Sequence, residues 1–214
     1  MFPLFKRMKA KTRQQRFREL QAVVNQGLNA CIIELAQDYL RDFPKHGVVW
    51  LDYGNALVDF ARYKEARVAF LKAIKYIKPE HLNFPYSYMG HLYENQGDYR
   101  RAAEWHEKAS KANPETSDHL IFLGAALSKI GKLSEAERCF RKAIKCKKGM
   151  IDEAYYNLGV ILEGRGKYKE ALACFENALK IDPKYKLAKQ AIKDMRRVLT
   201  IKDTFINRMH PTAN

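Results

Sequence analysis

The chain has 214 residues, 47% of them hydrophobic, and its 39 Lys and Arg outnumber its 24 Asp and Glu to give a formal net charge of +15. With 11 Gly and 7 Pro, this composition is typical of a folded helical protein and excludes an intrinsically disordered chain. No apolar run approaches the ~18 residues that mark a transmembrane helix, so the sequence predicts no membrane span.

The N-terminal stretch, residues 1–12, is predicted to be a basic extension. It reads MFPLFKRMKAKT, with one short apolar cluster before its charges, whereas a secretory signal has its charges first and a longer apolar core. The absence of acidic residues before Glu19 leaves a mitochondrial presequence as an alternative.

The cysteines and histidines do not have the spacing of a metal site. Cys31, Cys139, Cys146 and Cys174 form no Cys-x-x-Cys pair, and the six histidines are scattered. We therefore expect no metal and no cofactor. The free cysteines among apolar helix positions indicate a reducing compartment, and we expect a cytoplasmic protein.

Residues 13–46 predict a degenerate helical hairpin. RQQRFRELQAVVNQ would form its first helix, with Gly27 in the turn, and LNACIIELAQDYLRDFPKH would form its second helix. Pro44 ends that helix because proline cannot continue one. An atypical terminal hairpin is expected where one face of a stack meets water.

Residues 47–183 repeat one stretch four times. VDFARYKEA ends at Ala66, ENQGDYRRA at Ala102, SKIGKLSEA at Ala136 and EGRGKYKEA at Ala171, so the alanines are 36, 34 and 35 residues apart. A period of this length predicts stacked helical hairpins. The glycines of EGRGKYKEA are too close for a phosphate-binding loop, so a tight turn between helices is expected there.

The last repeat shows how each hairpin would pack. Large and small residues recur at helical spacing in two successive helices: Tyr155, Leu158, Gly159 and Leu162, then Ala171, Phe175 and Ala178. The small residues would let the two backbones approach closely. The pattern predicts repeats at about 47–80, 83–116, 117–150 and 152–185. His106, at an aromatic position of the second repeat, is expected to be packed in the core.

Residues 184–200 are predicted to form a capping helix. KYKLAKQAIKDMRRVL would place Leu187, Ala191, Met195 and Val198 on one face and charged residues elsewhere. The tail, residues 201–214, is expected to fray.

The repeated residues resemble the tetratricopeptide repeat family, with its order of large, small, aromatic, Ala, aromatic, Ala and Pro. The resemblance covers about 140 residues. It implies an all-α, right-handed superhelical solenoid of helical hairpins with a C-terminal capping helix. It also implies a non-catalytic protein-interaction module or scaffold, whose first helices line a concave groove that takes an extended or helical peptide.

Helical geometry gives the expected lining of that groove, because it consists of first-helix residues that point away from the packed stripe. The candidate peptide-binding residues are Leu51, Asn55, Phe84, Tyr88, His91, Asp118, Phe122, Tyr156 and Asn157. The aromatic run among them is not required by hairpin packing, and exposed apolar surface of this kind marks binding sites. The alternative is that a neighbouring helix or the tail covers it. Acidic residues dominate the lining, so a peptide with apolar and basic residues is expected.

Some members of the family hold a C-terminal carboxylate with lysine, arginine and asparagine on successive first helices. The corresponding positions here hold Leu51, Asn55, Tyr88, Asp118 and Phe122. Only Asn55 matches, so a chaperone tail bound by a carboxylate clamp is not expected.

Binding of nucleic acid or membranes and enzymatic catalysis are the two other classes of function. Basic residues gather in 1–20, 141–148 and 184–208, and such ends could bind RNA or an anionic membrane, although an acidic groove would repel phosphate. An enzyme is not expected, because the sequence lacks a convergent nucleophile, an acid–base pair and a metal set.

Overall fold

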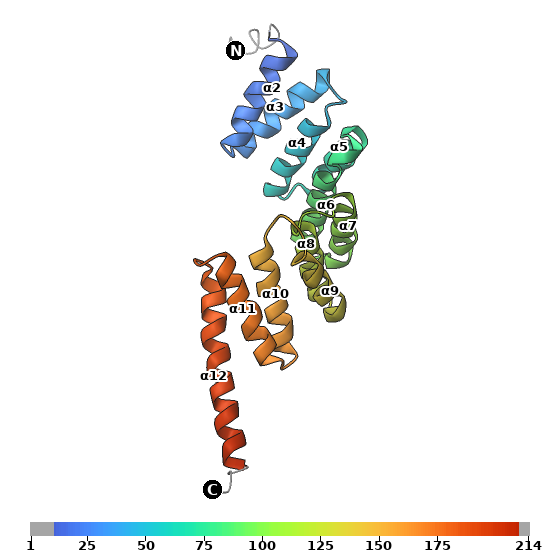
Figure 1. The fold of residues 1–214 in the computed structure, drawn as a ribbon. Helices are drawn as coiled ribbons and strands as arrows, with labels where there is room; N and C mark the ends of the chain where they lie inside the picture. Colours follow the sequence, from blue (N-terminus) through green and yellow to red (C-terminus); the bar gives the residue numbers. More distant parts are fainter. Residues whose placement is uncertain (1–10, 210–214) are drawn as a thin grey trace. The chain divides into compact units, whose positions relative to one another are not determined.

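The computed structural model describes residues 11–209, which are all-helical apart from turns and one isolated β-bridge (Figure 1). The chain divides into two compact units, one up to Gly97 and one from Asp98 onward. The helices of the first unit are α2 (Arg13–Asn25), α3 (Asn29–Asp42), α4 (Gly47–Asp59), α5 (Tyr63–Tyr76), the short 3-10 helix η1 (Pro79–His81) and α6 (Asn83–Asn95). Those of the second are α7 (Tyr99–Ala112), α8 (Asp118–Lys129), α9 (Leu133–Ala143), α10 (Ile151–Gly164), α11 (Tyr168–Ile181) and α12 (Lys186–Met209). The predicted all-α class is therefore confirmed for these residues.

The turns between helices follow the repeated glycines. Gly97, Gly131 and Gly166 all have φ between +73° and +79°, a left-handed conformation that glycine adopts without steric cost. Ala61 takes the same place in the α4–α5 turn, with φ of +55°. Ala61 thus replaces the turn glycine, and the turn keeps its shape at the cost of a strained alanine.

The helices of a hairpin approach closely where the sequence has a small residue. A Cβ atom placed on Gly124 would lie 2.6 Å from Cε1 of Phe140, and one on Gly159 would lie 2.5 Å from Cε1 of Phe175. Both phenylalanine rings are buried, at 2% and 0% exposed. The predicted pairing of small residue and aromatic ring is thus what brings α8 against α9 and α10 against α11.

The N-terminal hairpin of α2 and α3 forms as predicted, although its residues depart from the repeat pattern. The hydroxyl of Thr12 accepts from the backbone N–H of Gln15, and the Gln15 side chain accepts from the Thr12 N–H, a capping box that starts α2. Leu20 is fully buried against α3. The N-terminal cap of α2 and the apolar contact of Leu20 therefore both stabilise this hairpin.

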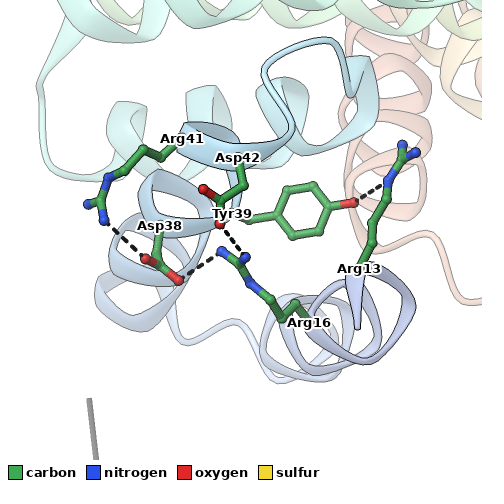
Figure 2. Close-up of polar contacts among 6 residues, drawn as sticks. All are labelled: Arg13, Arg16, Asp38, Tyr39, Arg41 and Asp42. Carbon is green, nitrogen blue, oxygen red and sulfur yellow. Dashed lines mark hydrogen bonds and ion pairs between the residues drawn. The ribbon is translucent and has the colours of Figure 1, made fainter. Parts of the chain in front are cut away.

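Polar contacts also join these two helices (Figure 2). The Arg16 guanidinium donates to Asp38 at 2.8 Å and to Asp42 at 2.6 Å, and Nε of Arg13 donates to the hydroxyl of Tyr39 at 3.2 Å. The Arg16 side chain is only 11% exposed, so its two ion pairs are shielded from water better than ordinary surface pairs. Basic residues of this region are thereby used to hold the hairpin together.

The capping helix differs from its prediction in length and register. It buries Ala188, Ile192 and Met195 against α11, whereas Leu187, which was expected on the packed face, is 58% exposed. Figure 1 shows α12 continuing past the end of α11, to Met209 rather than to Thr200. Residues 1–10 of the predicted basic extension and 210–214 of the predicted tail lie outside the described residues.

Candidate functional site

The nine predicted peptide-binding residues all lie on first helices of hairpins. In the first unit, Leu51 and Asn55 lie on α4, and Phe84, Tyr88 and His91 lie on α6. In the second unit, Asp118 and Phe122 lie on α8, and Tyr156 and Asn157 lie on α10. Each unit contains some of these first-helix residues. Within each unit the side chains differ in how exposed they are to solvent.

In the first unit, Phe84 is the aromatic side chain that packing leaves open, at 52% exposed. Tyr88 is only half-buried, but its ring stacks on Phe70 of α5 with 5.8 Å between centroids and an interplanar angle of 30°. Burial, with the charge of Asp52 nearby, raises the pKa of the Tyr88 hydroxyl. Because Phe70 belongs to the preceding hairpin, Tyr88 follows the alternative that a neighbouring helix covers it in part.

Polar residues surround Phe84 and Tyr88 on the same helices. Asn55 is exposed, and Nδ1 of His91 lies 2.8 Å from a carboxylate oxygen of Glu94. Asp52 accepts a 2.9 Å hydrogen bond from the Gln21 side chain of α2, and burial raises its pKa to about 6. Asp52 therefore carries its negative charge only above about pH 6, so the acidic character of this face weakens below that pH.

In the second unit, the two predicted aromatics are both used in packing. Phe122 lies against His106 of α7 with 5.4 Å between ring centroids, and His106 is fully buried, as predicted. Tyr156 lies between Phe175 of α11 at 5.6 Å and Tyr185 at 5.2 Å. Phe122 and Tyr156 are each half-buried, and a neighbouring helix supplies a partner for each ring, which is the alternative to a fully open aromatic run.

Asp118 has a structural role in the second unit. Its Oδ1 accepts a 3.0 Å hydrogen bond from the backbone N–H of Met150, the residue before α10, and a weaker one from the Ser117 hydroxyl at 3.4 Å. A Cβ atom on Gly149, which has φ of +104°, would overlap this carboxylate. Asp118 therefore fixes the loop that replaces the usual closing proline.

The polar neighbours on α10 are partly desolvated. Burial and the charge of Asp152 raise the pKa of Glu153, and Asn157 donates a hydrogen bond to it. Burial likewise raises the pKa of Tyr185 to about 12, with Glu153 adding to the shift. Asn157 is thus engaged within α10 and is less open to a ligand than Asn55 in the first unit.

Sequence reasoning missed two residues that contact this face, one from the degenerate hairpin and one from the end of the last repeat. Gln21 of the degenerate hairpin binds Asp52, and Tyr185 covers Tyr156. A signal for Tyr185 exists in the sequence: it follows Pro183 by two residues, just as His46 follows Pro44, and His46 also packs on an aromatic ring, that of Tyr39. No comparable pattern marks Gln21.

The basic segments are partly neutralised within the fold. Lys11 pairs with Glu19 at 2.6 Å, Lys147 pairs with Glu115 at 3.6 Å, and Arg196 pairs with Glu176 at 2.9 Å. In the part of the chain that is described, no helix is long and apolar enough to cross a membrane.

Comparison with known proteins agrees with the geometry. Models of the tetratricopeptide repeat match residues 89–151 and 152–185. No match to the sequence was found among curated proteins.

Three solved structures illustrate the likeness of fold. YrrB, a TPR protein with an unusual peptide-binding site, is 21% identical with a TM-score of 0.64, over 83% of this chain and 90% of its own. MamA from Desulfovibrio magneticus is 17% identical with a TM-score of 0.68, over 81% of this chain and 97% of its own. The Arabidopsis OM64 TPR domain is 26% identical with a TM-score of 0.53, over 56% of this chain and 98% of its own.

Proposed function

Because the chain belongs to the tetratricopeptide-repeat family, whose helical hairpins serve as scaffolds for protein–protein interaction, we propose that it binds a peptide segment of a partner protein on the first-helix face of its first unit. The wider groove expected from the sequence is narrowed to α4 and α6, where apolar side chains lie open to solvent.

The observation that carries this proposal is the pair Val48 and Phe84. Each stands six residues before the small glycine of its first helix, Gly54 or Gly90, so the two occupy equivalent positions on α4 and α6, which contact each other. Val48 is 44% exposed and Phe84 52% exposed. Exposed apolar side chains repeated at equivalent positions form an anchor point for an apolar ligand residue.

Polar residues further along the same two helices suit the rest of a peptide. The Asn55 amide is exposed and can both donate to and accept from a ligand backbone. Asp59 is exposed at the end of α4, where it accepts from the Asn29 side chain, and Glu94 is half-buried on α6 beside His91, so a lysine or arginine of the ligand would join carboxylates that already have a polar partner. The proposed ligand is therefore a segment with an apolar anchor and a basic residue further along its chain.

A selection from a random peptide library tests this proposal. We expect selected peptides to share an apolar residue with Lys or Arg further along, and to lose affinity by about 2 kcal/mol, or about thirtyfold, for Phe84→Ala. Phe60→Ala is the matched control, because Phe60 is 51% exposed but lies at the α4–α5 turn. Peptides that bind wild type and Phe84→Ala equally would refute the assignment of this face.

RNA or anionic-membrane binding through the basic ends is the second candidate. The net charge of +15 supports this candidate. The ion pairs of Lys11, Lys147 and Arg196 weaken that support, because they neutralise part of the positive charge in the basic segments. Retention on heparin or acidic vesicles that falls steeply between low and physiological salt would favour it. Absence of retention at low salt would leave these charges as solubilising residues.

A further inference from the structure

Two equivalent grooves lie on the second-helix side of the hairpins. One is formed by α3 and α5 over α4 in the first unit, with a volume of about 580 Å³. The other is formed by α7 and α9 over α8 in the second unit, with a volume of about 940 Å³. Because both are built from equivalent helices, their lining residues can be compared position by position.

At one lining position on the first helix of the hairpin, the first groove has a much larger residue than the second. In the first groove this position is Trp50, whose indole N–H donates to the carbonyl oxygen of Pro44 at 2.7 Å and whose ring lies 4.0 Å from Nζ of Lys72. In the second groove the equivalent residue, four before the hairpin glycine, is Leu120. Leucine is smaller than tryptophan, so the space that an indole fills in the first unit is open in the second.

The floor of the α7–α9 groove is apolar. Leu120 is half-buried, Leu123 and Leu127 are 9% and 7% exposed, and Ile130 is half-buried. The thiol of Cys139 also lines it, and burial raises the pKa of this thiol, so the floor carries no thiolate at neutral pH. Such a floor suits an apolar side chain of a ligand.

The rim of the groove is basic on one side. Seven Lys and Arg and four Glu line the groove, and three of the glutamates pair within it: Glu107 with Lys111 at 2.7 Å, Glu115 with Lys147 at 3.6 Å and Glu135 with Lys132 at 3.2 Å. This leaves Arg100, Arg138, Lys142 and Lys145 against Glu104. Three of those four cations come from α9 and the turn that follows it, so they form one basic wall beside the apolar floor.

We propose that the α7–α9 groove is a second interaction site, which binds an acidic segment of a partner protein. An apolar side chain of the segment lies on Leu120 and Leu123, where the first unit has its own tryptophan, and neighbouring Asp or Glu side chains pair with Arg138, Lys142 and Lys145. The charge preference is opposite to that of the first-helix face on α4 and α6, so the two sites take different ligands.

The test uses a groove-filling variant that the chain itself suggests. Leu120→Trp places at the second groove the residue that the first groove has at Trp50. A random peptide library is selected on wild type and then depleted on Leu120→Trp. We expect the peptides that bind wild type but are not retained by Leu120→Trp to be rich in Asp and Glu around an apolar residue. Their affinity for the variant should be about tenfold lower than their affinity for wild type.

The control variants separate this site from others. Arg138→Glu with Lys142→Glu should weaken the same peptides more at low salt than at physiological salt, because the exposed charges are screened. Lys169→Glu, an exposed charge change on α11, should leave binding unchanged, as should Phe84→Ala on the first-helix face. If Leu120→Trp proves unstable by circular dichroism, the double charge variant carries the test.

Three results would overturn the proposal. Depletion on Leu120→Trp could yield no acidic peptides, or the double charge variant could bind them with unchanged affinity. Alternatively, wild type could sediment as a dimer that Leu120→Trp or the double charge variant converts to a monomer, which would make the occupant a second copy of this chain.

Discussion

The partly buried carboxyl of Asp52 makes the stability of the first unit depend on pH. Burial raises the pKa of Asp52 to about 6, despite the hydrogen bond from Gln21, whereas an unfolded aspartate titrates near about 3.9. The folded protein therefore holds this proton more tightly than the unfolded chain. Stability from Asp52 is fully present below about pH 4 and is lost as the pH rises through about 6.

The magnitude follows from the size of the shift. A displacement of about two pKa units corresponds to roughly 3 kcal/mol, and the partial exposure of Asp52 reduces the expected value to about 1–2 kcal/mol. Asp52→Asn removes the titration and keeps an oxygen that accepts from Gln21. We therefore expect Asp52→Asn to be more stable than wild type by about 1–2 kcal/mol at pH 7.5 and equal to it at pH 4.

Urea unfolding followed by circular dichroism between pH 4 and 8 measures this difference. Glu80→Gln is the control, because Glu80 is an exposed carboxylate of the same unit. The reasoning is refuted if the difference between Asp52→Asn and wild type is the same at every pH, or if the variant is less stable at pH 7.5.

Three further changes test the packing of the hairpins by thermal unfolding. Ala61→Gly should raise stability by about 0.5–1 kcal/mol, because the turn holds alanine at a positive φ, and a lower melting temperature would contradict this. Gly124→Ala should cost about 1–3 kcal/mol, because its methyl group would overlap the ring of Phe140; unchanged melting would show that the ring moves freely. Asp118→Ala should cost about 1–2 kcal/mol, since it leaves the N–H of Met150 without its acceptor, and wild-type melting would show the contact to be dispensable.

The repeated residue pattern predicted the helices and turns, because it depends on residues close together in the sequence. The left-handed turn at Ala61 could be placed by its alignment with Gly97, Gly131 and Gly166, and the structure confirms it. The pairing of Gly124 with Phe140 likewise followed from helical spacing within one hairpin.

The capping helix was harder to predict because its sequence allows two stripes. Leu187, Ala191 and Met195 fit a helical face, but Ala188, Ile192 and Met195 fit another, and contact with α11 selects the second. Its length was misjudged for a different reason. The first helix-breaking residue after Thr200 is Pro211, which was the signal for a helix that continues to Met209.

The candidate site could be predicted only as a face, not as a set of free side chains. Helical geometry places Tyr88 and Phe122 away from their own helix's packed stripe, but it says nothing of rings that reach them from other helices. Phe70 and His106 do reach them, and Tyr185 reaches Tyr156. Exposure of Phe84 is likewise a result of three-dimensional packing.

Titration of a selected peptide into wild type, Phe84→Ala and Phe60→Ala by calorimetry is the most direct test of the central claim, that the first unit captures a partner peptide on α4 and α6. The account predicts that Phe84→Ala weakens binding about thirtyfold with unchanged melting temperature, while Phe60→Ala binds as wild type does. Equal affinity of all three proteins would contradict it.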